Sequence, residues 1–140
     1  KFLGKPDYLT ERIKKTLNDL EETTKDYSNH FLNIAIAYGG RTEILDGVKK
    51  IVEEVNTGEL NVDEIGLKTI EKHLYTSHLP NPEPDLIIRT SGEARLSGFL
   101  LWQGAYSELV FMDVYWPDFR KIDLMRAIRT YQNRLRRFGQ

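Results

Sequence analysis

Short apolar strands alternate with amphipathic helices along this sequence. Over residues 7–25, apolar side chains recur at helical spacing among polar ones, which predicts a helix with one narrow buried stripe. The dense apolar run 32–38 has branched residues at alternate positions and comes directly before another helical pattern, so it predicts a buried strand of a parallel sheet. The pair Gly39-Gly40 then makes the strand-to-helix turn, and Thr42 is the predicted N-cap of the next helix.

The middle of the chain predicts two helices and a proline-rich loop. A wide apolar face follows Thr42, and Gly58 is placed to end that helix. Apolar residues at helical spacing predict a further helix over residues 62–74. The segment 77–84 contains three prolines and must be a loop.

The last third repeats the pattern of strand and helix. Residues 86–88 and 109–112 predict short strands, the apolar-rich stretch between them predicts a helix after a break at Ser91-Gly92, and residues 121–137 predict the final helix. This alternation indicates an α/β fold, a parallel sheet flanked by helices, in a single domain over residues 1–140. Three strands make a small sheet, so we expect part of the sheet to be missing from this chain.

Composition narrows the classes of function. Charged residues make up 29% of the chain and the net charge is −1, which argues against a protein that coats nucleic acid. There is no cysteine, the three histidines lack metal-ligand spacing, and no apolar run approaches the length of a membrane span. We therefore expect a cytoplasmic protein. Because the sequence starts at Lys1 and not at methionine, we also expect a fragment or a processed product.

The strongest chemical signal is the loop that follows strand 86–88. Arg89, Arg95 and Ser97 stand in it, together with two further hydroxyl side chains. Guanidinium groups donate bidentate hydrogen bonds to phosphate oxygens, and a helix starting after Ser97 would direct its N-terminal dipole at the same anion. A bound phosphate or diphosphate is one interpretation. The other is that the arginines pair with Glu93, or another carboxylate, and lock a turn.

Two further positions are candidates for the same chemistry. Glu108 would repel a nearby diphosphate unless a cation lies between them, which suggests Mg²⁺; the alternative is a surface carboxylate. Gly40 and Arg41 follow a strand at the edge where open α/β sheets place ligands, and we take them as secondary candidates. Arg41 could equally form a structural ion pair with Glu43 or Asp46.

The surfaces of the last third suggest contact with another subunit. The final helix is basic, yet it lacks interleaved aromatic residues or a groove-reading motif, so we expect no nucleic-acid partner. The stretch 99–106 is more hydrophobic than a small sheet requires. Dimer packing is therefore a reasonable hypothesis.

Taken together, the motifs resemble those of the cis-prenyltransferases, the family of undecaprenyl and dehydrodolichyl diphosphate synthases. The stretches that carry the resemblance are Ile88-Arg89-Thr90-Ser91-Gly92-Glu93-Ala94-Arg95-Leu96-Ser97, Phe99-Leu100-Leu101-Trp102-Gln103, Leu32-Asn33-Ile34-Ala35, Tyr38-Gly39-Gly40-Arg41, Tyr106-Ser107-Glu108-Leu109, Trp116-Pro117-Asp118-Phe119 and Arg137-Phe138-Gly139. They span most of the chain in the family's order.

The resemblance implies an isoprenoid-forming transferase. Such an enzyme condenses isopentenyl diphosphate onto an allylic diphosphate, forms cis double bonds and requires Mg²⁺. By position, Arg89, Arg95 and Ser97 would hold the isopentenyl diphosphate, and Leu96 would contribute only its backbone. Glu108 matches the acidic residue associated with Mg²⁺.

The resemblance also implies a homodimer. The tail with Arg137 and Gly139 would reach across the interface to the neighbour's diphosphate site. Contact with a membrane would be peripheral at most, through the lipid product.

The chain departs from the family pattern at three points. Ala94 stands where some bacterial members have histidine, and Gly98 stands where asparagine or aspartate is usual. More important, the family's Asp-Gly-Asn-Gly-Arg-Trp motif, which carries the catalytic aspartate, does not occur in these 140 residues. We therefore expect the carboxy-terminal portion of a synthase that cannot turn over by itself. A non-catalytic partner subunit and a generic phosphate-binding module are the alternatives.

Overall fold

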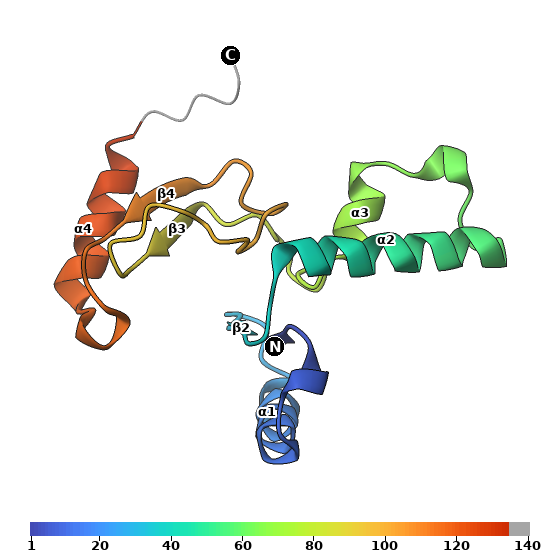
Figure 1. Ribbon diagram of the computed structural model, residues 1–140, viewed down its shortest axis with the longest axis horizontal. Coiled ribbons are helices and arrows are strands. Elements are labelled where there is room, and N and C mark those ends of the chain that lie inside the picture. Colours follow the sequence, from blue (N-terminus) through green and yellow to red (C-terminus); the bar gives the residue numbers. More distant parts are fainter. Residues whose placement is uncertain (135–140) are drawn as a thin grey trace. The chain divides into compact units, whose positions relative to one another are not determined.

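A computed structural model describes residues 1–134, and the chain divides into two compact units, residues 1–82 and residues 83–140. Each unit is described by itself. Figure 1 shows the course of the chain, with the first unit in blue to green and the second in yellow to red. Two parallel strand pairs accompanied by α-helices confirm the predicted α/β class.

The first unit contains a two-stranded parallel sheet and three α-helices. Its elements are β1 (Phe2–Leu3), η1 (Pro6–Tyr8), α1 (Glu11–Thr24), β2 (Ile34–Ala35), α2 (Gly40–Thr57), η2 (Val62–Glu64) and α3 (Leu67–His73).

The sheet of the first unit is shorter than the sequence predicts. Phe2 pairs with Ile34 and Leu3 with Ala35, so β2 covers two residues of the predicted strand 32–38. Strand β1 was not predicted, because two apolar residues are too few to show alternation. The pairing ends at Gly4, where an added Cβ would lie 2.0 Å from the Ile36 carbonyl oxygen.

Helix α2 begins earlier than the sequence predicts and ends where expected. Gly39 is its N-cap residue, so Thr42 lies inside the helix, and its predicted role as N-cap is wrong. At the other end Gly58 adopts a left-handed conformation with φ 79°, as the predicted C-terminal glycine requires. Ile51 is buried, but Val52 on the predicted apolar face remains 51% exposed. The described residues of this unit therefore cover only part of that face.

A buried carboxylate fastens the start of α2. Glu43 is fully buried; it accepts hydrogen bonds from the Tyr38 hydroxyl and, at 2.8 Å, from the backbone N–H of Tyr75. One turn later, Asp46 accepts from Lys5 and from the Tyr75 hydroxyl. Bonding to Lys5, and then to Tyr75, lowers the pKa of Asp46. These polar groups satisfy one another and fix the turn that precedes α2.

The predicted helix 62–74 consists of two pieces. A 3₁₀ turn, η2, is followed by an extended Gly66 (φ −138°, ψ −174°), and α3 then begins at Leu67. An extended residue cannot continue a helix, so a single helical pattern in the sequence becomes two elements. His73 Nε2 lies 2.7 Å from a carboxylate oxygen of Glu54 and so connects α3 to α2.

The second unit contains a parallel strand pair and one α-helix. Its described elements are β3 (Leu86–Arg89), β4 (Glu108–Phe111), η3 (Trp116–Asp118) and α4 (Lys121–Gln132). The register pairs Leu86 with Glu108 and Arg89 with Phe111. Figure 1 shows α4 beside this strand pair.

The helix predicted between β3 and β4 is wrong, since residues 98–106 form a series of turns. Ser97, Gly98 and Leu100 have φ values of 50°, 81° and 45°, and left-handed residues interrupt the repeated i to i−4 hydrogen bonds of an α-helix. A single bond of that type remains, from the N–H of Gly104 to the carbonyl of Leu100 at 2.8 Å. Ser97 therefore caps no helix.

The remaining predictions for this unit differ in extent. The predicted strands 86–88 and 109–112 correspond to β3 and β4 with ends shifted by one residue, whereas α4 ends at Gln132, before the predicted residue 137. Across residues 1–134, no helix combines the length and the apolar character needed to cross a membrane.

Candidate functional site

The candidate site is the loop after β3, and backbone hydrogen bonds fasten its first turn. The N–H of Ser91 donates to the carbonyl of Val114 at 2.8 Å, and the N–H of Gly92 donates to Met112 at 3.0 Å. Both Ser91 and Gly92 have positive φ, 80° and 71°. The loop is thus anchored to the chain that leaves β4, and no local pattern in the sequence indicates this anchoring.

Arg89 spans the loop from its first residue to its last. Its Nη1 donates to the backbone carbonyl of Arg95 and, at 2.9 Å, to Ser97 Oγ. Both acceptors are neutral, so the positive charge of Arg89 is not cancelled by a carboxylate of the described chain. The geometry holds a guanidinium and a hydroxyl together at the end of a strand, which is an arrangement suited to an anion.

Arg95 is held differently. Its Nη1 lies 2.7 Å from Glu93 Oε2, and the two side chains are 67% and 42% exposed. The paired-turn interpretation thus describes Arg95 in this structure, but it does not describe Arg89. Leu96, the neighbour of Arg95, accepts a hydrogen bond from the N–H of Phe99 at 3.0 Å through its backbone carbonyl.

Glu108 lies at the opposite end of the strand pair from the loop. It pairs with Leu86, three positions before Phe111, which pairs with Arg89. Three residues of a parallel strand span roughly 10 Å. Glu108 Oε2 also forms an ion pair with Arg134 Nη1 at 3.0 Å, so the structure does not bring it together with the loop arginines.

A fit to Mg²⁺ can be tested on these donors. Residues 1–134 contain no group of three or more histidine or acidic side chains placed to hold a metal ion. Mg²⁺ needs one or two carboxylates together with phosphate oxygens and water. Glu108 is paired with a cation at a distance from the loop, so the described residues of one copy do not form a Mg²⁺ site there.

The secondary candidates lie in the other unit. Gly40 is the first residue of α2, and Arg41 follows it with an exposed side chain. The predicted partners of Arg41 are engaged elsewhere, because Glu43 binds two tyrosines and Asp46 binds Lys5. Within residues 1–134, no carboxylate forms an ion pair with Arg41. The last two candidates, Arg137 and Gly139, lie outside the described residues.

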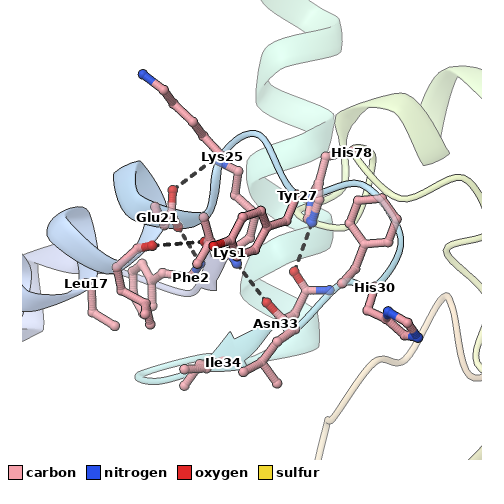
Figure 2. A pocket seen from close by; sticks show the side chains of 14 residues that line it. Lys1, Phe2, Leu17, Glu21, Lys25, Tyr27, His30, Asn33, Ile34 and His78 are labelled. Atoms are coloured by element: carbon pink, nitrogen blue, oxygen red, sulfur yellow. Dashed lines mark hydrogen bonds and ion pairs between the residues drawn. The ribbon is translucent and has the colours of Figure 1, made fainter.

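The first unit also contains a cavity of about 330 Å³ that the sequence did not predict. Figure 2 shows Leu17 of α1, Phe2 and Ile34 among the side chains around it. Its lining comes from α1, β1 and the segment that leads into β2.

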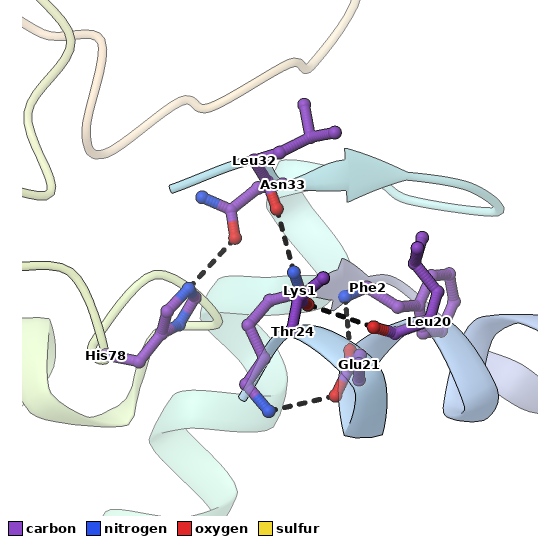
Figure 3. Close-up of polar contacts among 8 residues, drawn as sticks. All are labelled: Lys1, Phe2, Leu20, Glu21, Thr24, Leu32, Asn33 and His78. Atoms are coloured by element: carbon purple, nitrogen blue, oxygen red, sulfur yellow. Dashed lines mark hydrogen bonds and ion pairs between the residues drawn. The ribbon is translucent and has the colours of Figure 1, made fainter. Parts of the chain in front are cut away.

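The polar groups at this cavity bond to one another (Figure 3). The Glu21 carboxylate accepts from the N–H of Phe2 at 2.6 Å, and His78 Nε2 lies 2.9 Å from Asn33 Oδ1. Burial lowers the pKa of His78, which favours its neutral form. These contacts hold β1 and the segment before β2 in place. The arrangement differs from that of the loop, where the Arg89 guanidinium bonds to the Ser97 hydroxyl.

Comparison with known proteins gives a consistent result. Residues 1–139 match the protein family described as "Putative undecaprenyl diphosphate synthase". The tritrans,polycis-undecaprenyl-diphosphate synthase (geranylgeranyl-diphosphate specific) of Methanocaldococcus jannaschii is 55% identical over 138 residues, which are 99% of this chain and 49% of that protein. The protein of the same name from Thermoplasma volcanium is 54% identical over 140 residues, 100% of this chain and 54% of its own length.

Solved structures agree with these relatives. The lavandulyl diphosphate synthase of Lavandula x intermedia, in complex with dimethylallyl diphosphate, superposes with a TM-score of 0.96 at 36% identity, covering 100% of this chain and 59% of that one. A probable undecaprenyl diphosphate synthase of Campylobacter jejuni gives 0.82 at 31% identity, covering 100% and 62%. The chain spans about half the length of the curated relatives it matches. With motifs, fold and relatives in agreement, the chain belongs to the cis-prenyltransferase family of undecaprenyl diphosphate synthases.

Proposed function

We propose that this chain carries the isopentenyl diphosphate half of a cis-prenyltransferase site. The observation that supports the proposal most directly is the Arg89–Ser97 contact at 2.9 Å, which holds a guanidinium without a carboxylate partner at the end of β3. A diphosphate bound there would accept hydrogen bonds from Arg89, Ser97 and, once its side chain leaves Glu93, Arg95.

Orientation is the catalytic contribution expected from these residues. Two guanidinium groups on one diphosphate would fix the position of the attached isopentenyl group, and its double bond would then lie in a defined direction for attack on an allylic carbon. The names of the relatives suggest geranylgeranyl diphosphate as the allylic partner and a polyprenyl diphosphate as the product.

A metal ion belongs to the proposal only as an expectation of the family. Mg²⁺, when bound, would stabilise negative charge that develops on a leaving diphosphate. Glu108 is the candidate ligand, and its ion pair with Arg134 would have to open first. Within residues 1–134, no group of three or more histidine or acidic side chains is placed to hold the ion.

The family motif with the catalytic aspartate does not occur in these 140 residues, so we propose that this chain by itself does not form product. Arg137 and Gly139 would serve the neighbour's site in a homodimer. A cytoplasmic location with peripheral membrane contact through the lipid product would suit this chemistry.

Direct titration with isopentenyl diphosphate tests the proposal. Losing one charge-assisted donor should weaken binding about tenfold or more in Arg89→Gln. Arg129→Gln is the matched control, because it removes the same charge from an exposed position on α4. Equal affinities for wild type and Arg89→Gln would contradict the assignment. Steady polyprenyl formation by the 140-residue chain from labelled substrates would contradict its expected inactivity.

A further inference from the structure

The two arginines of the loop are restrained in different ways. Arg89 is fixed by two neutral acceptors, the Arg95 carbonyl and Ser97 Oγ. The side chain of Arg95 instead meets a carboxylate two residues away, with Nη1 2.7 Å from Glu93 Oε2. Arg89 therefore restrains the backbone of Arg95, while Glu93 contacts the guanidinium of Arg95.

The Arg95–Glu93 pair is accessible and weak enough to exchange. The Arg95 and Glu93 side chains are 67% and 42% exposed, so water screens their attraction. Water can also solvate both charged groups once the pair separates. An anion that reaches Arg95 competes with Glu93 for the Nη1 donor of the guanidinium. Arg89 and Arg95 together carry two positive charges, and the negative charge of Glu93 lowers the net charge of the loop's three side chains to one positive charge.

We propose that Glu93 is a built-in competitor that lowers the affinity of the loop for diphosphate by occupying Arg95. The inference rests on the proposed function, since it requires the loop to bind a diphosphate. A ligand that accepts from the Nη1 donor of Arg95 displaces the Glu93 carboxylate, and the carboxylate returns when the ligand leaves. Glu93 thereby limits how tightly the diphosphate is held, in a site whose ligand must be exchanged.

Inorganic diphosphate, titrated with a chelator present, is the probe. We expect Glu93→Gln to bind it about three- to fivefold more tightly than wild type, the range expected for opening an exposed ion pair and removing one nearby negative charge. The gain should shrink as salt is added. Glu83→Gln is the matched control, because it removes the same charge from an exposed position before β3, at the other end of that strand from the loop.

A double-mutant cycle shows whether Glu93 acts through Arg95. In an Arg95→Gln background, the Glu93→Gln change should give a clearly smaller gain, because the side chain with which Glu93 competes is gone and only the removal of a nearby negative charge is left. The same gain in both backgrounds would mean a general charge effect and would overturn the proposal. Weaker binding by Glu93→Gln when Mg²⁺ is added would mean that Glu93 holds the metal, which would also overturn it.

The two proposals fail in different ways. If wild type binds diphosphate and Arg95→Gln binds it less well, yet Glu93→Gln gives no gain, the competitor is refuted and the site stands. If wild type shows no diphosphate binding, or if Arg89→Gln and Arg95→Gln bind as well as wild type, the proposed function and this inference both fall.

Discussion

Arg89 donates a hydrogen bond to Ser97 at 2.9 Å, and this contact joins the last residue of β3 to a residue eight positions further along the chain. The distance in sequence matters because the intervening residues then form a closed loop. The guanidinium is held in one direction before any ligand binds, so less conformational freedom is lost when a ligand does bind. The loop is in this sense preorganised for an anion.

Ser97→Ala should weaken isopentenyl diphosphate binding by about three- to tenfold. The change removes one hydroxyl donor and one of the two acceptors that hold Arg89 in its orientation. Isothermal titration measures the effect, and Ser28→Ala, at an exposed position of the first unit, is the control. Unchanged binding by Ser97→Ala would remove this hydroxyl from the site.

Ser91→Gly should raise the free energy of unfolding by about 0.5–1 kcal/mol. Ser91 has a φ of 80°, where a residue with a Cβ is strained by about 1–2 kcal/mol. Glycine relieves the strain, although its greater freedom in the unfolded chain offsets part of the gain. Thermal unfolding measures the change; a lower melting temperature for Ser91→Gly would contradict the prediction.

Above pH 6.5, the free energy of unfolding of the first unit should fall with rising pH, because His73 loses its proton. The Thr69 carbonyl, and then the Glu54 carboxylate, raise the pKa of His73 from 6.5, with burial and then Lys50 opposing. A raised pKa in the folded state means that the stabilisation is complete below pH 6.5 and is lost as the pH rises through the folded value. The free energy of unfolding of wild type should therefore fall relative to that of His73→Gln over this range.

His78 titrates with the opposite sign, which separates the two histidines. Burial lowers the pKa of His78 from 6.5, so its contribution is present above pH 6.5 and is lost as the pH falls through the folded value. Denaturant unfolding between pH 6.5 and 8.5 thus isolates His73. In the Glu54→Gln variant, the free energy of unfolding should decline less with rising pH than in wild type. If the free energies of wild type and His73→Gln change in parallel with pH, His73 does not contribute to the pH dependence.

Arg134→Gln should lower the free energy of unfolding by about 0.5–1.5 kcal/mol, because it breaks two charge-assisted contacts on a partly exposed side chain. Arg134 Nη1 contacts Glu108 Oε2 at 3.0 Å and the Leu109 carbonyl at 2.7 Å, and so joins the chain after α4 to the start of β4. Arg129→Gln, which loses the same charge at an exposed position on α4, should change stability much less. If the two variants unfold alike, Arg134 does not fasten α4.

Part of the fold could be predicted from the sequence because some signals are local. The periodicity of apolar residues predicted α1 and α4 with errors at their ends, and Gly58 marked the end of α2 because a left-handed residue is required there. The helix predicted after Ser97 failed for the opposite reason. Its apolar spacing suits a helix, but the backbone conformations of Ser97 and Leu100 depend on contacts that the spacing does not contain.

The candidate site also combines features that the sequence predicts with contacts that only the structure shows. The sequence by itself determined the residue types that suit a diphosphate, Arg89, Arg95 and Ser97, because charge and hydrogen-bonding capacity are properties of side chains. Only the tertiary structure decided that Arg89 bonds across the loop to Ser97, that Arg95 pairs with Glu93, and that Glu108 pairs with Leu86 at the far end of the strands. The physical reason is that partners depend on strand register and loop closure, which bring together residues that the sequence does not place side by side.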